Sequence, residues 1–271
     1  MSRWGRVIAA LAALIAAPLA GAESADSPPT QPIEFLLTGH FQLRTHGEKD
    51  PDAKIYVATG QATVLVLSDR LRRPVLLTAR EKTAQALEPE ALTPDPKDSD
   101  RLVVDPSRTL GQPLVAKVSG GRLSFVAAGK RVIIEPADPW LGDATAEEIL
   151  ARLPEQRRAA RVYPPRLGQM RLLERNERQL RMLVFLGSWC PHCERLIPRL
   201  IRVLEDLGDK APEATFHLVP RSIVDDLTAR QYGVEGVPTV ILFEGDEEIA
   251  RLTGDELKRP ELSLARVLFA D

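Results

Sequence analysis

The chain has 271 residues, of which 44% are hydrophobic and 27% are charged, a balance typical of globular proteins and sufficient for two domains. Its formal net charge of −2 at pH 7 is too close to neutral to indicate a polyanionic partner, and no nucleic-acid role is expected.

The first 22 residues have the pattern of a secretory signal peptide. Arginines precede an apolar run from Val7 to Ala17, which is followed by a proline and by the small residues Ala20-Gly21-Ala22. The run is shorter than the roughly 20 residues that a membrane-spanning helix needs. We therefore expect cleavage after Ala22, export across the inner membrane, and a mature protein in the periplasm.

Residues 33–142 are predicted to form a β-rich domain of unknown function. Short apolar or alternating runs, separated by turns, predict strands at Ile33–Leu37, Lys54–Val57, Ala62–Leu67 and Pro74–Thr78. A hairpin is expected from 114–118 and 122–126 around Gly120-Gly121, followed by a third strand at 131–135. The segment 88–113, rich in prolines and acids, is predicted to be a long surface loop.

Residues 143–165 are predicted to form a helical linker. Thr145 and Glu148 have the spacing of a capping box, and Pro154 should end the first helix and begin a second. The stretch 152–181 is rich in arginine, which favours a solvated helix face between domains over a membrane-surface role.

Residues 166–271 alternate between strand and helix patterns, as expected of an α/β domain. Strands are predicted at 182–186 and 215–219, and a final hairpin at 239–243 and 248–252. Helices are predicted at 193–207, 222–232 and 260–269.

The only two cysteines of the chain lie in the tetrapeptide Cys190-Pro191-His192-Cys193, between a predicted buried strand and an amphipathic helix. A disulfide across so short a ring adds little stability, so reactivity explains the pair better. The helix N-terminus should lower the pKa of Cys190, which is the predicted nucleophile, and Cys193 is the predicted resolving thiol. A protonated His192 would stabilise the Cys190 thiolate and make the pair more oxidising.

Two metal-binding alternatives are weaker. Half of a zinc site would need further ligands from His40, His46, His217 or scattered carboxylates, because no other cysteine exists. Delivery of Cu(I) by the cysteine pair is chemically reasonable, but nothing else in the sequence supports it. We expect no metal and no cofactor.

The run of motifs from about residue 166 to residue 271 resembles the thioredoxin-fold family. Ser188-Trp189-Cys190-Pro191-His192-Cys193 looks like the family's active-site segment, and Pro198 matches a proline that kinks the following helix. Residues 232–239, Tyr-Gly-Val-Glu-Gly-Val-Pro-Thr, are similar to the stretch that carries the family's cis-proline. The resemblance implies a thioredoxin-like α/β domain at the C-terminal end of a chain that begins with the β-rich domain.

By this resemblance the Val237-Pro238 bond should be cis, and Val237, Pro238 and Trp189 should face the substrate. An exposed main-chain edge next to a disulfide suits an extended peptide, so cysteine-containing exported proteins are the expected partners. The resemblance thus implies an enzyme, a periplasmic thiol-disulfide oxidoreductase.

The direction of electron flow rests on a few positions. Thioredoxins have a buried acid where this chain has Val184, which argues against a thioredoxin-like reductase. The Cys-Pro-His-Cys sequence and Val237 are instead similar to strongly oxidising periplasmic enzymes, although Cys193 and Pro238 are too close in sequence for the helical insertion of those enzymes. The sequence therefore leans toward an oxidant.

Two other functions stay open. One is a disulfide reductase or isomerase that a membrane redox partner recharges. The other is an envelope binding or assembly protein whose β domain does the work, with an accessory thioredoxin domain.

Overall fold

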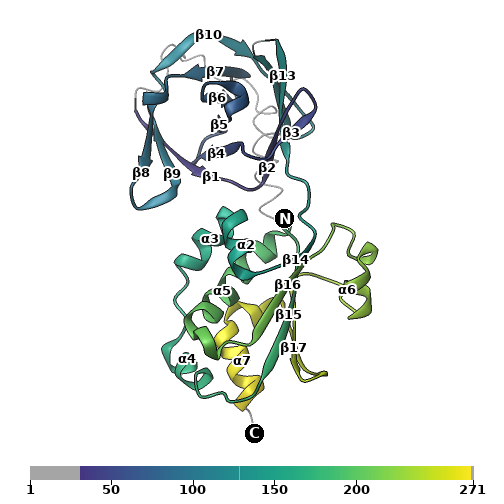
Figure 1. Ribbon diagram of the computed structural model, residues 1–271. Helices are drawn as coiled ribbons and strands as arrows, with labels where there is room; N and C mark the ends of the chain where they lie inside the picture. The colour runs from purple at the N-terminus through teal and green to yellow at the C-terminus, as the bar shows by residue number, and fades with distance from the viewer. Residues whose placement is uncertain (1–30, 128, 270–271) are drawn as a thin grey trace, which may run out of the picture. The chain divides into compact units, whose positions relative to one another are not determined.

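A computed structural model describes residues 31–127 and 129–269. The signal peptide and its cleavage site lie outside the described residues. The chain forms two compact units that divide between Asp138 and Pro139 (Figure 1). No helix among the described residues is both long and apolar enough to cross a membrane.

The first unit consists of two antiparallel sheets. The larger sheet has eight strands in the order β10-β7-β6-β5-β4-β1-β9-β8. Its strands are β1 (Ile33–Leu37), β4 (Lys54–Ala58), β5 (Thr63–Leu67), β6 (Val75–Thr78), β7 (Thr83–Leu87), β8 (Leu92–Asp95), β9 (Asp98–Val104) and β10 (Thr109–Val115). The smaller sheet has the order β11-β12-β13-β2-β3. Its strands are β2 (Phe41–Thr45), β3 (Glu48–Asp50), β11 (Lys117–Ser119), β12 (Arg122–Ala127) and β13 (Lys130–Pro136).

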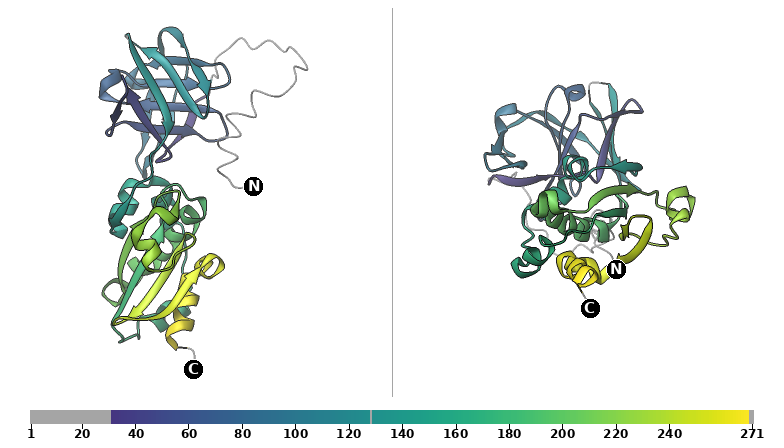
Figure 2. Two further views of the ribbon diagram at one scale, coloured as in Figure 1. Left: turned by 90° about the vertical axis from the view of Figure 1, so that its right-hand side faces the viewer. Right: turned by 60° about the horizontal axis from the view of Figure 1, so that its bottom comes forward.

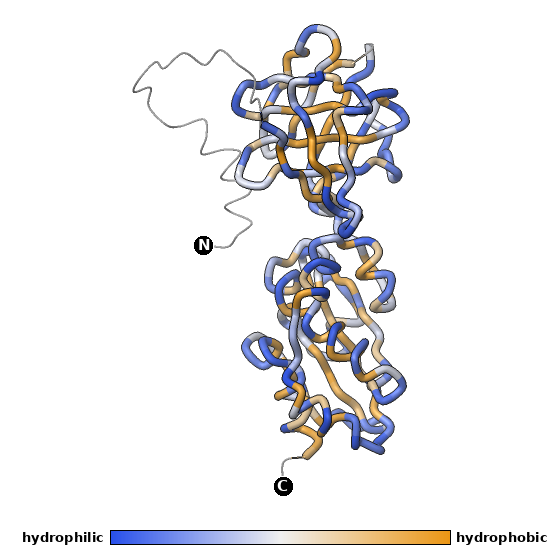
Figure 3. Tube along the Cα trace, turned by 90° about the vertical axis from the view of Figure 1, so that its left-hand side faces the viewer, coloured by the Kyte–Doolittle hydropathy of each residue, from blue (hydrophilic) through white to orange (hydrophobic). Residues whose placement is uncertain are grey.

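Alternating side chains of the larger sheet are buried on both of its faces. Val64 and Val66 pack with residues of the smaller sheet such as Phe125, whereas Leu65 packs on the opposite face with Phe35. The apolar strands and polar turns of this unit are visible along the chain in Figure 3. Short 3-10 turns at Asp69–Leu71 and Pro89–Ala91 complete the unit.

The four early strand predictions are confirmed as β1, β4, β5 and β6, and the third strand of the hairpin region is confirmed as β13. The predicted hairpin is confirmed only in part. β11 and β12 pair around the two glycines, but residues 114–115 belong to β10, which pairs with β7 in the other sheet. The chain therefore passes between the sheets at Ala116, which is buried.

The predicted surface loop at 88–113 is wrong, because this segment holds β8, β9 and most of β10. The prolines fit because Pro94 lies on the end strand of the sheet and Pro113 lies where the register of β10 is irregular. The alternation in β9 was hidden because one of its inward positions is Asp100, which is buried together with Leu102 and Val104.

The second unit is a five-stranded sheet in the order β14-β16-β15-β17-β18, with helices on both faces (Figure 2). β15 runs parallel to β16 and antiparallel to β17. The strands are β14 (Gly142–Ala144), β15 (Leu180–Leu186), β16 (Glu213–Leu218), β17 (Thr239–Glu244) and β18 (Glu247–Thr253). The helices are α2 (Ala146–Arg152), α3 (Pro154–Arg161), α4 (Leu167–Leu173), α5 (Pro191–Leu207), α6 (Leu227–Gln231) and α7 (Pro260–Phe269). Short 3-10 turns lie at Gly208–Lys210, Ile223–Asp225 and Gly254–Lys258.

β15 separates two apolar clusters in this unit. Met182, Val184 and Leu186 point toward α5 and α7, whereas Leu183 and Phe185 point toward α6. β15 is thus buried on both faces, which explains why its sequence is a continuous apolar run.

The segment 143–165, predicted as a helical linker, holds α2 and α3, and α3 packs on α5. The capping box is confirmed, because the Thr145 hydroxyl accepts from the Glu148 N–H at 3.2 Å and the Glu148 carboxylate accepts from the Thr145 N–H at 2.9 Å. The helix expected at 222–232 is shorter than predicted and comprises a 3-10 turn followed by α6.

Candidate functional site

The two cysteines lie where β15 leads into α5. Cys190 is the N-cap of this helix and has an extended backbone, which leaves its side chain over the first unpaired N–H groups. Its Sγ accepts a hydrogen bond from the Cys193 N–H at 3.3 Å. The geometry that the sequence predicted for the first thiol is therefore present.

The two thiols differ in exposure and in acidity. Cys190 is 6% exposed, whereas Cys193 is fully buried and accepts the Gly187 N–H at 3.5 Å. A hydrogen bond from the Cys193 side chain, aided by the N–H groups of Cys193 and His192 and by the charge of Arg195, lowers the pKa of Cys190 to about 7. Burial raises the pKa of Cys193 well above its ordinary value. A single nucleophile with a protonated neighbour is the arrangement that thiol-disulfide exchange requires.

His192 is exposed, and it acts on the thiolate through its main-chain N–H. The cationic side chain that lowers the pKa of Cys190 is instead that of Arg195, which was not among the residues predicted from the sequence. The sequence feature that indicates this role is a cation near the start of a helix whose N-cap is the cysteine.

The loop before β17 reaches the first cysteine from a distant part of the sequence. The Cys190 thiol donates to the Val237 carbonyl oxygen at 3.6 Å. The Val237-Pro238 peptide bond is cis, as predicted. Val237 is half-buried and Pro238 is buried, so it is the main chain of this loop that lies beside the sulfur.

Trp189 is fixed next to the cysteines by two contacts. Its Nε1 donates to the Val219 carbonyl at 3.0 Å, just after β16, and the Arg221 guanidinium lies 5.5 Å from its ring centroid. Gly187 permits this position, because a Cβ atom there would lie 2.6 Å from Cε2 of the indole. No motif in the sequence indicated the role of this glycine.

The histidines of the zinc alternative are distributed over the two units. His217 lies on the face of the sheet that α6 covers, where its ring nitrogens bond to Asp143 at 2.5 Å and Asp226 at 3.1 Å. His40 and His46 belong to the first unit. Within the described ranges, no group of three or more histidine, cysteine or acidic side chains is arranged to hold a metal ion.

At the position of the family's buried acid, Val184 is fully buried and packs in the cluster under α5. The structure thus has a buried apolar group at the position that the sequence singled out.

The second unit combines this sheet topology with a cysteine pair at the start of its longest helix and a neighbouring cis-proline loop. These features define a redox protein of the thioredoxin fold. The family model described as Thioredoxin matches residues 171–266. The chain belongs to the thioredoxin family through this C-terminal domain, and the β-rich domain precedes it.

Several curated relatives are similar to this chain. A thioredoxin from Chlamydia caviae is 36% identical over 75 residues, which cover 27% of this chain and 67% of that protein. Thioredoxin H2-2 from rice (Oryza sativa subsp. japonica) is 33% identical over 89 residues, 31% of this chain and 61% of its own length. Human protein disulfide-isomerase A4 is 27% identical over 107 residues, 38% of this chain and only 16% of that protein.

Proposed function

We propose that this protein is a thiol-disulfide oxidoreductase of the periplasm that exchanges a Cys190–Cys193 disulfide with cysteine-containing exported proteins. The observation that carries the proposal is the asymmetry of the two thiols, an N-cap cysteine with a pKa of about 7 in front of a buried cysteine with a raised pKa. The names of the thioredoxin and disulfide-isomerase relatives support the same chemistry.

In the oxidising direction, a substrate thiolate attacks the Cys190 sulfur of the enzyme disulfide and forms a mixed disulfide, while Cys193 leaves as a thiolate. A second substrate thiolate then attacks the substrate sulfur of the mixed disulfide and releases Cys190 as a thiolate. The substrate loses two electrons and gains a disulfide, and the enzyme becomes a dithiol. The stabilised Cys190 thiolate is the better leaving group of the pair.

In this proposal, Trp189 and the loop at Val237 and Pro238 hold the substrate. The Val237 carbonyl lies within 3.6 Å of the reacting sulfur, so a peptide that lies along this loop has its own cysteine near Cys190. Main-chain recognition of this kind accepts many sequences, which suits a protein with many clients.

The proposal that the protein acts as an oxidant rests on Val184 and on the Cys-Pro-His-Cys sequence. A reductase or isomerase recharged by a membrane redox partner is the second candidate, and a specific observation favours it. Strong oxidants have a nucleophile pKa near 3.5, whereas a value of about 7, as for Cys190, is that of thioredoxin. The exposed side chain of His192, moreover, is not among the groups that lower this pKa.

Redox titration of the full chain against glutathione separates the two candidates. A potential near about −120 mV supports the oxidant, and one near about −270 mV overturns it in favour of the reductase.

Trapping with oxidised glutathione tests the nucleophile. We expect Cys193→Ala to accumulate a mixed disulfide with glutathione at Cys190, detectable by intact-protein mass spectrometry. Cys190→Ala is the matched control and should accumulate almost none, because its remaining thiol is buried and protonated. Equal trapping by both variants would contradict the assigned roles.

Export is tested by fractionation of cells that produce the full chain, followed by N-terminal sequencing. The proposal expects a periplasmic protein that begins at Glu23, and an intact N-terminus in the cytoplasmic fraction would overturn it.

A further inference from the structure

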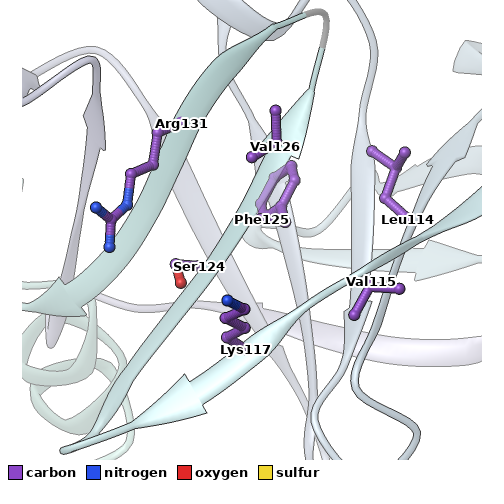
Figure 4. A pocket seen from close by; sticks show the side chains of 7 residues that line it. All are labelled: Leu114, Val115, Lys117, Ser124, Phe125, Val126 and Arg131. Carbon is purple, nitrogen blue, oxygen red and sulfur yellow. The ribbon is translucent and has the colours of Figure 1, made fainter.

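A groove opens in the first unit where β10 and β12 diverge. It has a volume of about 450 Å³, within the range of ligand-binding pockets, and Figure 4 shows the side chains that line it. Leu114 and Val115 lie on one side of the groove, Phe125 and Val126 on the other. Both valines are unusually exposed for their type, at 79% for Val115 and 57% for Val126.

The groove begins where a strand pairing stops. β11 and β12 are paired as far as Lys117 opposite Ser124. If the pairing continued in the same register, Val115 would lie opposite Val126. That pair is not formed, because residues 114–115 have moved to β7 in the other sheet. The edges of β10 and β12 therefore separate at this point.

The main-chain groups of Val126 face into the groove. On β13, the carbonyl of Arg131 accepts from the His46 N–H at 3.0 Å, on the side away from β12. Arg131 and Val126 are opposite one another, so they form a pair without mutual hydrogen bonds, and the N–H and C=O of Val126 point away from β13.

On the other edge, the main-chain groups of Val115 also face away from the strand that is paired with it. The Ala116 N–H donates to the Lys82 carbonyl at 2.7 Å on the β7 side, and main-chain groups alternate along a strand. The N–H and C=O of Val115 therefore point away from β7, toward β12. Among the described residues, no strand pairs with either edge at this level.

The side chains around these edges divide into two faces. Since cross-strand neighbours share a face, Val115, Val126, Lys117 and Arg131 lie together on the outer face. Phe125, only 3% exposed, points to the opposite face and belongs to the core. Neither Lys117 nor Arg131 forms an ion pair with any described residue, and the lining of the groove includes no acid.

We propose that this groove binds an extended polypeptide segment that alternates apolar and acidic side chains. The segment pairs its main chain with Val126 or Val115 and places carboxylates beside Lys117 and Arg131 on the outer face. Its apolar side chains lie on the opposite face, toward Leu114, which is 40% exposed. Free strand edges favour a polypeptide over an anionic lipid, because a lipid would leave the main-chain groups of both valines without partners. This site does not depend on the redox function of the other unit.

The test uses the full wild-type chain and a fluorescein-labelled, cysteine-free peptide in which valine alternates with glutamate. Fluorescence anisotropy should show binding of this peptide. A peptide with lysine in place of each glutamate should bind with an affinity lower by a factor of about ten or more. Arg131→Glu should weaken binding of the acidic peptide by a similar factor. Lys54→Glu, an exposed cation on β4 outside the groove, is the matched control and should bind as the wild type does.

Hydrogen exchange tests the strand pairing independently of any variant. Addition of the acidic peptide should slow exchange at the amides of Val126 or Val115. Val126→Pro, which removes one free N–H, should also weaken binding, provided that its circular dichroism matches the wild type.

Several results would overturn the proposal. These are the absence of peptide binding, an equal loss of affinity in Lys54→Glu and Arg131→Glu, and unchanged exchange at both valine amides. Binding of sodium oleate in the groove with no binding of the peptide would likewise replace the polypeptide by a lipid.

Discussion

At the scale of single residues, Cys190 and Cys193 differ because of where the chain places each sulfur. Cys190 caps the helix and accepts an N–H, so its charged form is stabilised by donors. Cys193, one turn further along, points into the core, where desolvation opposes any charge. Identical side chains therefore have opposite pKa shifts within four positions.

The rate of Cys190 alkylation should depend on pH with a midpoint near 7. Only the thiolate reacts, and a pKa lowered to about 7 means that reactivity rises through this pH instead of near 8.5. Iodoacetamide labelling of the reduced full chain, followed by mass spectrometry, measures the profile. Cys193→Ala removes the thiol donor, so its midpoint should move upward. A midpoint near 8.5 in both proteins would show that the environment of Cys190 does not activate it.

At the scale of secondary-structure elements, the site depends on a tight fit between the end of β15 and the indole of Trp189. Gly187 lies against the ring, and its N–H also donates to Cys193. The indole in turn donates to the carbonyl of Val219, the residue that follows β16. Three elements are thus joined through one position that has no side chain.

Gly187→Ala should destabilise the protein by about 1–3 kcal/mol, because a Cβ 2.6 Å from Cε2 of Trp189 forces the ring or the strand to move. It should also slow Cys190 alkylation. Urea unfolding measures the first effect. Gly168→Ala is the control, because Gly168 lies in α4 and has nothing within 4 Å of its Cβ position. This variant should be more stable than the wild type by about 0.5–1 kcal/mol. Equal stability of the two variants would contradict the close packing of Trp189 against Gly187.

The sequence predicted these elements unevenly. β15 and α5 were evident because a buried apolar run and a helical apolar stripe are local patterns. β9 was missed because its register is fixed by pairing with β1, Phe35 opposite Leu102, and one of its inward positions is an acid. Local hydrophobicity cannot reveal a strand whose burial depends on a partner far along the chain.

At the scale of the whole molecule, each unit has apolar clusters of its own. In the first unit, Leu77 is fully buried in the cluster formed between its two sheets. In the second, Leu200 of α5 is fully buried in the cluster under the cysteines. The two cores share no residue, which predicts that each unit loses stability separately.

Leu77→Ala and Leu200→Ala form a matched pair of tests. Each truncation should cost about 2–5 kcal/mol in its own unit. Hydrogen exchange followed by peptide-resolved mass spectrometry should show faster exchange at 31–127 for the first variant and at 139–269 for the second. Of the two variants, only Leu200→Ala should change the rate at which Cys190 is alkylated. If either variant accelerated exchange equally in both units, the units would be coupled.

The sequence by itself determined the position of the redox pair, the capping of its helix and the existence of two kinds of domain. These features depend on residues within a few positions of one another, whose spacing sets hydrogen bonds and buried faces directly. Only the tertiary structure placed the Val237 carbonyl beside Cys190, and only it showed β10 leaving β12 to open a groove. Such contacts are decided by which distant strands pair and in which register, because burial of whole faces, and not local preference, selects the pairing.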